Sequence, residues 1–381
     1  MKFVHCSSLY GLFVRRLFDG IQPESQTYDM LMNRIIASRF GWSDYWITWM
    51  KPLGWEGRLV FGNCDIVQRA WWRENKQYHR EPESLKNIAL EQIRIFQPDI
   101  VFLEDLYFYD HQFRQEVRDI MPHARFIGWR FAPHRTTDCF DMLDGLVTGA
   151  KSFADEFRHL GIPCEVVPLA FDTSLLKEVK MHDRDVPISF AGQVGGRSAV
   201  HGGRYALILS LLKHTELQVW GMWFPEANPF RISQFPKWFR QYRESNFLRK
   251  RIKSPVFGLD YFELLGRSRI VFNAHIDVAA NFAGNMRMFE ACGMGACLVT
   301  DWKKNINDFF EPDVDLVCYK TNDEAVKKIT YLVEHPQEAR KIAESGKCWT
   351  IKEHTYEKRA PLLDGFFQRI LHNKHQTVSI S

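Results

Sequence analysis

The sequence has no run of about 18 uncharged apolar residues, which argues against a transmembrane helix. Its eight cysteines include no C-x-x-C pair, so a zinc site built from paired cysteines is not expected. The net charge of +4 over 381 residues is too small to indicate nucleic-acid binding. The N-terminal stretch lacks a continuous apolar segment, so we expect a first strand there rather than a signal peptide, in a cytoplasmic protein with reduced thiols.

Short apolar runs alternate with amphipathic stretches along the chain, an order typical of parallel α/β sheets. The expected strands lie at 2–5, 100–103, 126–129, 145–147 and 164–167, and then at 188–192, 217–220, 270–273, 297–300 and 315–319. Residues 174–186 are charged and lack the periodicity of a core element, which indicates a linker. We therefore predict an N-terminal domain at 1–178, a C-terminal domain at 187–355 and a final helix at 356–373.

The segment 285–301, NMRMFEACGMGACLVTD, predicts a short amphipathic helix followed by a buried strand. Asn285 is a suitable helix cap. Arg287 in the first turn opposes the helix dipole, at a cost of about 0.3–1 kcal/mol, unless an anion binds at that end. Glu290 lies almost one turn further and could accept hydrogen bonds from sugar hydroxyls. A phosphate at one end and hydroxyls at the other describe a nucleotide sugar.

This segment resembles the donor-binding helix of GT-B glycosyltransferases, especially the spore-maturation-protein-like branch with its N-x-R-x-F-E-A-x-x-x-G pattern. The resemblance extends over about residues 255 to 365, where the order of elements and the His354-Thr355-Tyr356 triplet also fit. It implies an α/β protein of the GT-B fold, with two Rossmann-like doubly wound domains facing a central cleft. It also implies that the final helix returns to the first domain.

One position departs from the pattern of the retaining GT-B enzymes. Those enzymes usually carry two glutamates eight positions apart, and Glu290 fits the second, which holds the donor ribose. The first would fall at Phe282, which has no carboxylate. The resemblance therefore implies a donor site but leaves the stereochemistry of transfer open.

Glycines and arginines follow the expected strand at 188–192, in the segment FAGQVGGRSAVHGGR. Backbone N–H groups near Gly192 can approach a diphosphate closely, and Arg197 or Arg204 can neutralise it. A flexible surface loop with solvated arginines is the alternative. Asn273 and His275 end another expected strand, where they could contact phosphate or sugar, although a single histidine is more often simply packed.

Candidate acceptor-side bases lie in the first domain. Glu104 and Asp105 close the expected strand IVFLED, and His134 follows another strand. Any of the three could deprotonate an acceptor hydroxyl. The alternative for the two carboxylates is a solvated or helix-capping role.

The D-x-D motif of metal-dependent glycosyltransferases is absent from any suitable context, because Asp183-Arg184-Asp185 lies in the expected linker. We therefore expect neither a catalytic metal nor another cofactor, and take the nucleotide-diphosphate sugar as the donor substrate.

Residues 230–253 carry eight lysines and arginines against one acid, interleaved with aromatic residues. Such a stretch could dock on an anionic membrane or a lipid-linked acceptor. The alternative is a packed helical insertion with a solvated basic face.

The sequence thus predicts a metal-independent glycosyltransferase that moves a sugar from a nucleotide-diphosphate donor to a hydroxyl of a glycan, glycolipid or glycoprotein. Two other functions stay open. One is a nucleotide-sugar epimerase on the same fold, and the other is a non-catalytic protein that binds nucleotide sugars or glycans.

Overall fold

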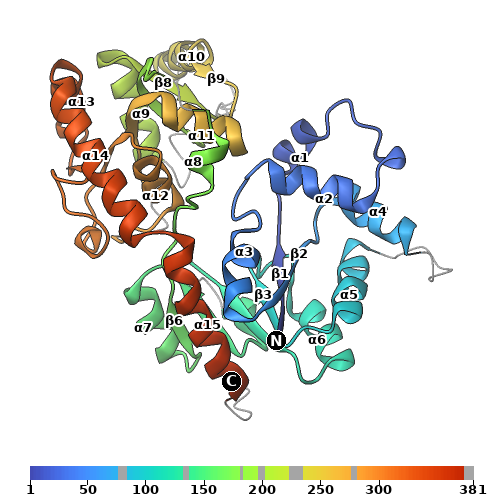
Figure 1. Cartoon of the computed structure of the whole chain (residues 1–381). Helices are drawn as coiled ribbons and strands as arrows, with labels where there is room; N and C mark the ends of the chain where they lie inside the picture. Colours follow the sequence, from blue (N-terminus) through green and yellow to red (C-terminus); the bar gives the residue numbers. More distant parts are fainter. Residues whose placement is uncertain are drawn as a thin grey trace. The chain divides into compact units, whose positions relative to one another are not determined.

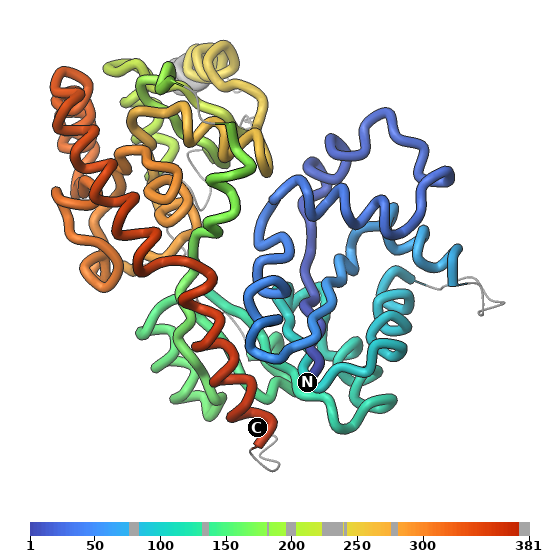
Figure 2. The backbone as a smooth tube through the Cα atoms, viewed as in Figure 1, coloured from blue at the N-terminus to red at the C-terminus, as the bar shows by residue number. Residues whose placement is uncertain are grey.

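The computed structural model describes residues 1–75, 84–131, 137–180, 183–195, 202–222, 235–275 and 281–372. The chain forms two compact units, one of Met1–Pro168 with Tyr356–Ser381 and one of Leu169–Thr355. Each unit contains one six-stranded sheet in which all paired strands are parallel (Figure 1). The C-terminal helix belongs to the same unit as the N-terminal strand (Figure 2).

The first unit has the strand order β2-β1-β3-β4-β5-β6. Its strands are β1 (Lys2–Ser7), β2 (Glu56–Phe61), β3 (Ile100–Leu103), β4 (Arg125–Trp129), β5 (Gly145–Thr148) and β6 (Cys164–Val166). Its α-helices are α1 (Gly11–Leu17), α2 (Tyr28–Ala37), α3 (Tyr45–Met50), α4 (Asp65–Glu74), α5 (Leu85–Phe96), α6 (His111–Ile120), α7 (Lys151–His159) and α15 (Tyr356–His372). All residues of β3 and β5 are buried, as expected for strands covered on both faces.

Aromatic side chains join α3 and α15 to one face of this sheet. Phe3 of β1 and Phe102 of β3 both contact the ring of Phe367 in α15. The indole of Trp55 also packs on Phe367, and its Nε1 donates a hydrogen bond to Asp364 Oδ1 at 2.8 Å. Helices α5 and α6 lie on the opposite side of the sheet (Figure 1).

The second unit has the strand order β12-β11-β10-β7-β8-β9. Its strands are β7 (Val186–Ala191), β8 (Leu217–Trp220), β9 (Ile252–Lys253), β10 (Ser268–Phe272), β11 (Cys297–Asp301) and β12 (Val317–Tyr319). Its α-helices are α8 (Leu175–Glu178), α9 (Gly202–His214), α10 (Phe235–Arg249), α11 (Gly258–Arg267), α12 (Met286–Gly293), α13 (Asn322–Glu334) and α14 (Pro336–Glu353).

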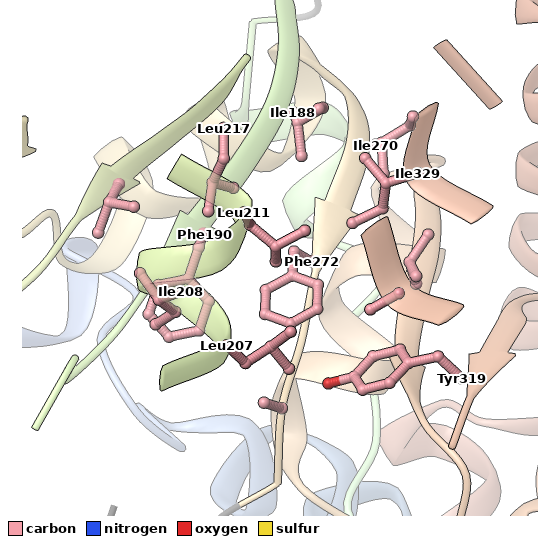
Figure 3. Close-up of a cluster of buried hydrophobic side chains, with 14 of the residues drawn as sticks. Ile188, Phe190, Leu207, Ile208, Leu211, Leu217, Ile270, Phe272, Tyr319 and Ile329 are labelled. Atoms are coloured by element: carbon pink, nitrogen blue, oxygen red, sulfur yellow. The ribbon is translucent and has the colours of Figure 1, made fainter. Parts of the chain in front are cut away.

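The core of the second unit forms where alternate residues of its strands meet α9 and α13. Ile188, Phe190, Ile270 and Phe272 come from adjacent strands and pack with apolar residues of the two helices, including Leu211 (Figure 3). A strand presents every second residue to one face. This face is therefore filled by even-numbered residues of β7 and β10, while Ser189 and Val271 point to the other.

The strand order reverses once in each unit. In the second unit the chain runs from β7 outward through β8 and β9, then returns to the other side of β7 at β10. In the first unit the same reversal separates β1 from β3. Ligands of open parallel sheets bind at the carboxyl ends of the strands beside such a reversal. The fold therefore points to Gly192 with Asn273 in one unit, and to the residues around Ser7 and Glu104 in the other.

The α/β class and the alternation of strands and helices are confirmed. Two strands lie outside the predicted ones. The first half of β2, starting at Glu56, is polar and partly exposed, and β9 has only two residues, so neither gives the apolar run of a buried strand. None of the described helices is long and apolar enough to cross a membrane.

Candidate donor site in the second unit

Helix α12 begins beside the ends of β7 and β10, and its first residues contact both. Asn285 occupies the N-cap position, but the expectation that its side chain caps the helix is wrong, because it accepts no hydrogen bond from the first turn. Its Nδ2 instead donates to Asn273 Oδ1 at 3.0 Å. The first-turn N–H groups of α12 are therefore not capped by this side chain, which leaves them able to bind an anion.

Arg287 is held at this helix start by two neighbours. Its Nη1 donates to Asn273 Oδ1 at 3.0 Å, and its guanidinium lies 5.5 Å from the centre of the Phe190 ring. Its Nε is buried and has no hydrogen-bond partner among the residues that the structure describes. Among the described residues no carboxylate forms an ion pair with it, and the nearby Asp301 is paired with His275 and Lys303 instead.

Gly192 allows this arginine to approach β7. The residue has φ of +152°, a conformation that favours glycine, and a Cβ atom there would lie 2.8 Å from Arg287 Nη2. The close approach thus explains the glycine in the segment that the sequence analysis selected for phosphate binding.

Asn273 connects the elements of the site rather than facing solvent. The residue is fully buried, and its Nδ2 donates to Thr300 Oγ1 at 2.9 Å while its Oδ1 accepts from Asn285 and Arg287. Its backbone oxygen accepts from the Tyr319 hydroxyl at 3.0 Å. These bonds use the polar atoms of its side chain, and through them Asn273 holds Asn285 and Arg287 in place.

Glu290 lies on α12 with one carboxylate oxygen already bonded. The Tyr261 hydroxyl donates to its Oε2 at 3.0 Å, and no described residue bonds its Oε1. Burial raises the pKa of Glu290 to about 7, although the Tyr261 hydrogen bond and the charge of Arg287 both act to lower it. This carboxyl group therefore changes its charge near neutral pH.

His275 and Asp301 form a buried pair at the ends of β10 and β11. Asp301 Oδ1 accepts from the backbone N of His275 at 2.9 Å and lies 2.7 Å from its Nδ1. Burial raises the pKa of Asp301, but the hydrogen bond and charge of His275, together with Lys303, outweigh it and hold this pKa well below its usual value. An ionised carboxylate only accepts, so Nδ1 carries the proton. The Nε2 of His275 is buried, and no residue in the described part of the chain bonds it.

Arg204 is buried at the start of α9, and its guanidinium donates to backbone carbonyl oxygens. Nη2 donates to Ala274 O at 2.6 Å and Nη1 to Gln193 O at 3.2 Å. These bonds tie the loop after β7 to the loop after β10. Its buried guanidinium thus fixes the two loops in place and puts a positive charge next to their backbone. Arg197 lies outside the described residues.

The acceptor-side candidates lie at the carboxyl end of β3 in the first unit. Asp105 Oδ1 accepts from the backbone N of Tyr107 at 3.1 Å and of Phe108 at 3.0 Å, so this carboxylate closes the turn after β3. Glu104 makes no such turn bond, and 26% of its side chain is exposed. His134 lies outside the described residues.

His5, which the sequence analysis did not select, lies beside Glu104. Its Nε2 is 3.4 Å from Glu104 Oε2, and its ring stacks with Trp42 and Phe102 at centre distances of 5.6 and 5.3 Å. The residue is buried. A polar residue within the otherwise apolar run Phe3–Cys6 was the only signal in the sequence that could have identified it.

Residues 204–364 match the sequence profile of a family described as glycosyl transferase-like. No curated protein sequence matches the chain. Among solved structures, the chain is similar to a complex of Anabaena Alr3699/HepE with UDP-glucose, with a TM-score of 0.61 and 12% identity over 97% of this chain and 100% of that one. It is also similar to a glycosyltransferase from Rickettsia africae ESF-5, with a TM-score of 0.57 and 13% identity over 98% and 99% of the two chains.

A third similar structure is the apo form of the lipopolysaccharide outer core galactosyltransferase WaaB, with a TM-score of 0.54 and 14% identity over 97% and 99% of the chains. At these identities the structural likeness establishes the fold. It says nothing about individual site residues.

Proposed function

We propose that this protein moves a sugar from a nucleotide-diphosphate donor to an acceptor hydroxyl. The match of residues 204–364 to the glycosyl transferase-like profile and the GT-B fold of its two sheets support this proposal. The observation that carries this proposal is Arg287, a cation without a carboxylate partner among the described residues, placed at an uncapped helix start beside Gly192.

The donor diphosphate would bind at the start of α12. Arg287 and the first-turn N–H groups would supply positive charge where negative charge develops on the departing diphosphate, the main electrostatic task in a transfer of this kind. Glu290 Oε1 would accept a hydrogen bond from a ribose hydroxyl. The unpartnered Nε2 of His275, with its ring fixed by Asp301, would face a phosphate oxygen or a sugar hydroxyl.

UDP is the first nucleotide to test, because the similar Anabaena protein is described in complex with UDP-glucose and with UDP. The proposal is tested by thermal-shift and calorimetric titration with UDP and other nucleoside diphosphates, followed by measurement of UDP release from UDP-sugars. Release of UDP with transfer to an acceptor or to water supports a transferase.

The same assay separates the two other functions. Incubation with the donor alone would give an epimeric sugar nucleotide if the protein were an epimerase. Nucleotide binding without release in the presence of any acceptor would identify a binding protein, a function that stays open because position 282 is a phenylalanine and not a glutamate.

Catalysis is expected to persist in EDTA. No group of three or more histidine, cysteine, aspartate or glutamate side chains in the described part of the chain is arranged to hold a metal ion. We assign the stabilisation of the diphosphate to Arg287 and to backbone N–H groups instead. UDP release should therefore proceed at an unchanged rate after chelation and dialysis. Loss of activity that magnesium or manganese restores would contradict this assignment.

The basic aromatic stretch 230–253 is proposed to contact an anionic membrane or a lipid-linked acceptor. In its described part, Phe239 and Tyr242 expose 45% and 52% of their surfaces. The guanidinium of Arg251 lies 3.9 Å from the centre of the Phe247 ring. Exposed aromatic rings on a segment that also carries several cations suit the interface of a bilayer.

Replacing Arg249, Lys250 and Arg251 with glutamine is expected to weaken binding to phosphatidylserine vesicles at low salt by about 3 kcal/mol, since each cation near such a surface contributes about 1 kcal/mol. Vesicle co-sedimentation measures this. UDP affinity should not change. A variant with Lys327, Lys341 and Lys352 replaced by glutamine is the control, because it removes the same charge from α13 and α14. If the parent does not bind vesicles, or if the two variants bind them with equal affinity, the stretch does not contact a membrane. It is then an ordinary packed helix with a solvated basic face.

A further inference from the structure

The second unit contains a cavity of about 730 Å³ at the amino ends of its strands, the edge of the sheet away from the candidate donor site. Pro187 of β7, Ile270 of β10 and Gly295, which precedes β11, form its sheet side. Apolar residues of α13 and α14, Leu332 and Ala339 among them, form part of the opposite wall. This volume falls within the range of about 300–1,000 Å³ that small-molecule sites occupy.

Positive charge predominates in the lining of this cavity. Four cations, Arg184, Arg269, Arg340 and Lys347, face two carboxylates, Asp183 and Glu344. Within the described residues none of these cations forms an ion pair with a carboxylate, whereas Arg267 in the same unit pairs with Asp185.

Two of the four cations are close enough to repel one another. Burial lowers the pKa of Arg184, and the positive charge of Arg340 lowers it further. Two positive charges that repel one another raise the electrostatic potential in the cavity, and an anion that bound there would relieve the repulsion.

Backbone bonds hold Arg184 in place. Its Nη2 donates to Met294 O at 2.9 Å and its Nη1 donates to Ser268 O, while Arg269 Nε donates back to Arg184 O at 2.8 Å. The Nη groups of Arg269 make no hydrogen bond with a described residue.

Gly295 permits the cations to crowd together here. It has φ of +74°, and a Cβ atom at this position would lie 2.9 Å from Arg184 Nη2 and 3.1 Å from Lys347 Cδ. The glycine thus gives both side chains room at the sheet edge. Arg184 and Lys347 therefore come close together where the chain enters β11 beside α14.

We propose that this cavity, the basic amino-edge cavity, binds a small phosphorylated metabolite. Its phosphate oxygens would bond the guanidinium groups of Arg269 and Arg340 and the ammonium of Lys347, because arginine recognises phosphate with paired N–H donors. Its less polar part would lie against Ile270 and Leu332. This cavity is separate from the donor site, so the phosphorylated metabolite and the donor nucleotide can be bound at the same time.

Calorimetric titration of the full chain with inorganic pyrophosphate and with ribose 5-phosphate tests this, with saturating UDP added to occupy the donor site. The variant R269Q/R340Q is expected to bind at least one of the two probes at least about tenfold more weakly than the parent. Raising the salt concentration should weaken binding in the parent. The variant K327Q/K341Q removes equal charge from α13 and α14 outside the cavity and should bind like the parent.

No binding of either probe by the parent, or equal affinity in the parent and in R269Q/R340Q, would overturn the proposal. An equal loss in K327Q/K341Q would also overturn it, because binding would then follow net charge rather than the cavity. If UDP itself does not bind, the donor-site proposal fails, yet the comparison between the two double variants still reports on the cavity. An unchanged melting temperature in R269Q/R340Q excludes misfolding as the cause of the loss.

Discussion

Replacing Arg287 with glutamine is expected to weaken UDP binding by about 1.5–3 kcal/mol, roughly ten- to a hundredfold, the usual loss of a hydrogen bond to a charged group. The guanidinium lies at the start of α12 with Nε buried and unpartnered, so a bound phosphate would supply its missing partner. Without a bound anion, a cation at the N-terminus of a helix lowers the stability of the fold by about 0.3–1 kcal/mol. The free energy of unfolding should therefore change by less than about 1 kcal/mol, because relief of this cost offsets the lost bond to Asn273.

Calorimetry with UDP and a thermal melt of each variant measure the two quantities. Arg267→Gln is the matched control, since Arg267 is an arginine of the same unit whose partner is Asp185. Equal UDP affinity in the parent and Arg287→Gln, or an equal loss in Arg267→Gln, would remove Arg287 from the donor site. A large drop in stability would assign it a structural role through Asn273 instead.

The same titration has a pH dependence that reports on Glu290. Because its pKa in the free protein is about 7, the carboxylate that accepts a ribose hydroxyl forms only as the pH rises through neutrality. UDP affinity should therefore increase from acidic pH to about pH 7.5, and Glu290→Gln should bind with little dependence on pH in this window. The free energy of unfolding should change with pH in the opposite direction to UDP affinity. A raised carboxyl pKa adds stability at low pH, which is lost as the pH rises from about 4.5 to 7.

Features that depend on residues close in sequence could be predicted well. The buried strands follow from short apolar runs such as Ile100–Leu103, because a strand covered on both faces needs no alternation. The placement of Arg287 and Glu290 on one short helix follows from their spacing. Whether they bind a nucleotide sugar stays a prediction.

Features that depend on long-range packing could not be predicted from the sequence. The residue type and position of Asn285 predict a helix cap, yet Asn273, which follows β10, bonds its side chain instead. The same holds for Arg204, whose partners are carbonyl groups of two separate loops. Nothing in the local sequence around His5 indicates that β3 places Glu104 against it. The basic amino-edge cavity likewise assembles from segments that the chain order separates.

Glu104 is the acceptor-side group for which we expect the largest catalytic effect. It follows β3, beside the point where the strand order of the first unit reverses, which is where open parallel sheets bind their ligands. Its Oε2 makes no hydrogen bond with a described residue, and its neighbour His5 Nε2 lies 3.4 Å away. The rings of Trp42 and Phe102 stack on that histidine and hold it beside Glu104. Asp105, in contrast, uses one oxygen to close a turn.

Glu104→Gln is therefore expected to lower the rate of UDP release at saturating donor by about 10²–10⁴-fold, the range that a general base contributes. UDP affinity should stay unchanged because the donor residues belong to the other unit. Asp105→Asn is the matched control and should lower the rate less than tenfold, since its amide oxygen can still accept the two turn bonds. A base on the first unit predicts inversion at the sugar carbon, which analysis of the product anomer measures. If Glu104→Gln keeps the parental rate and the product retains its configuration, the base is instead an oxygen of the departing diphosphate.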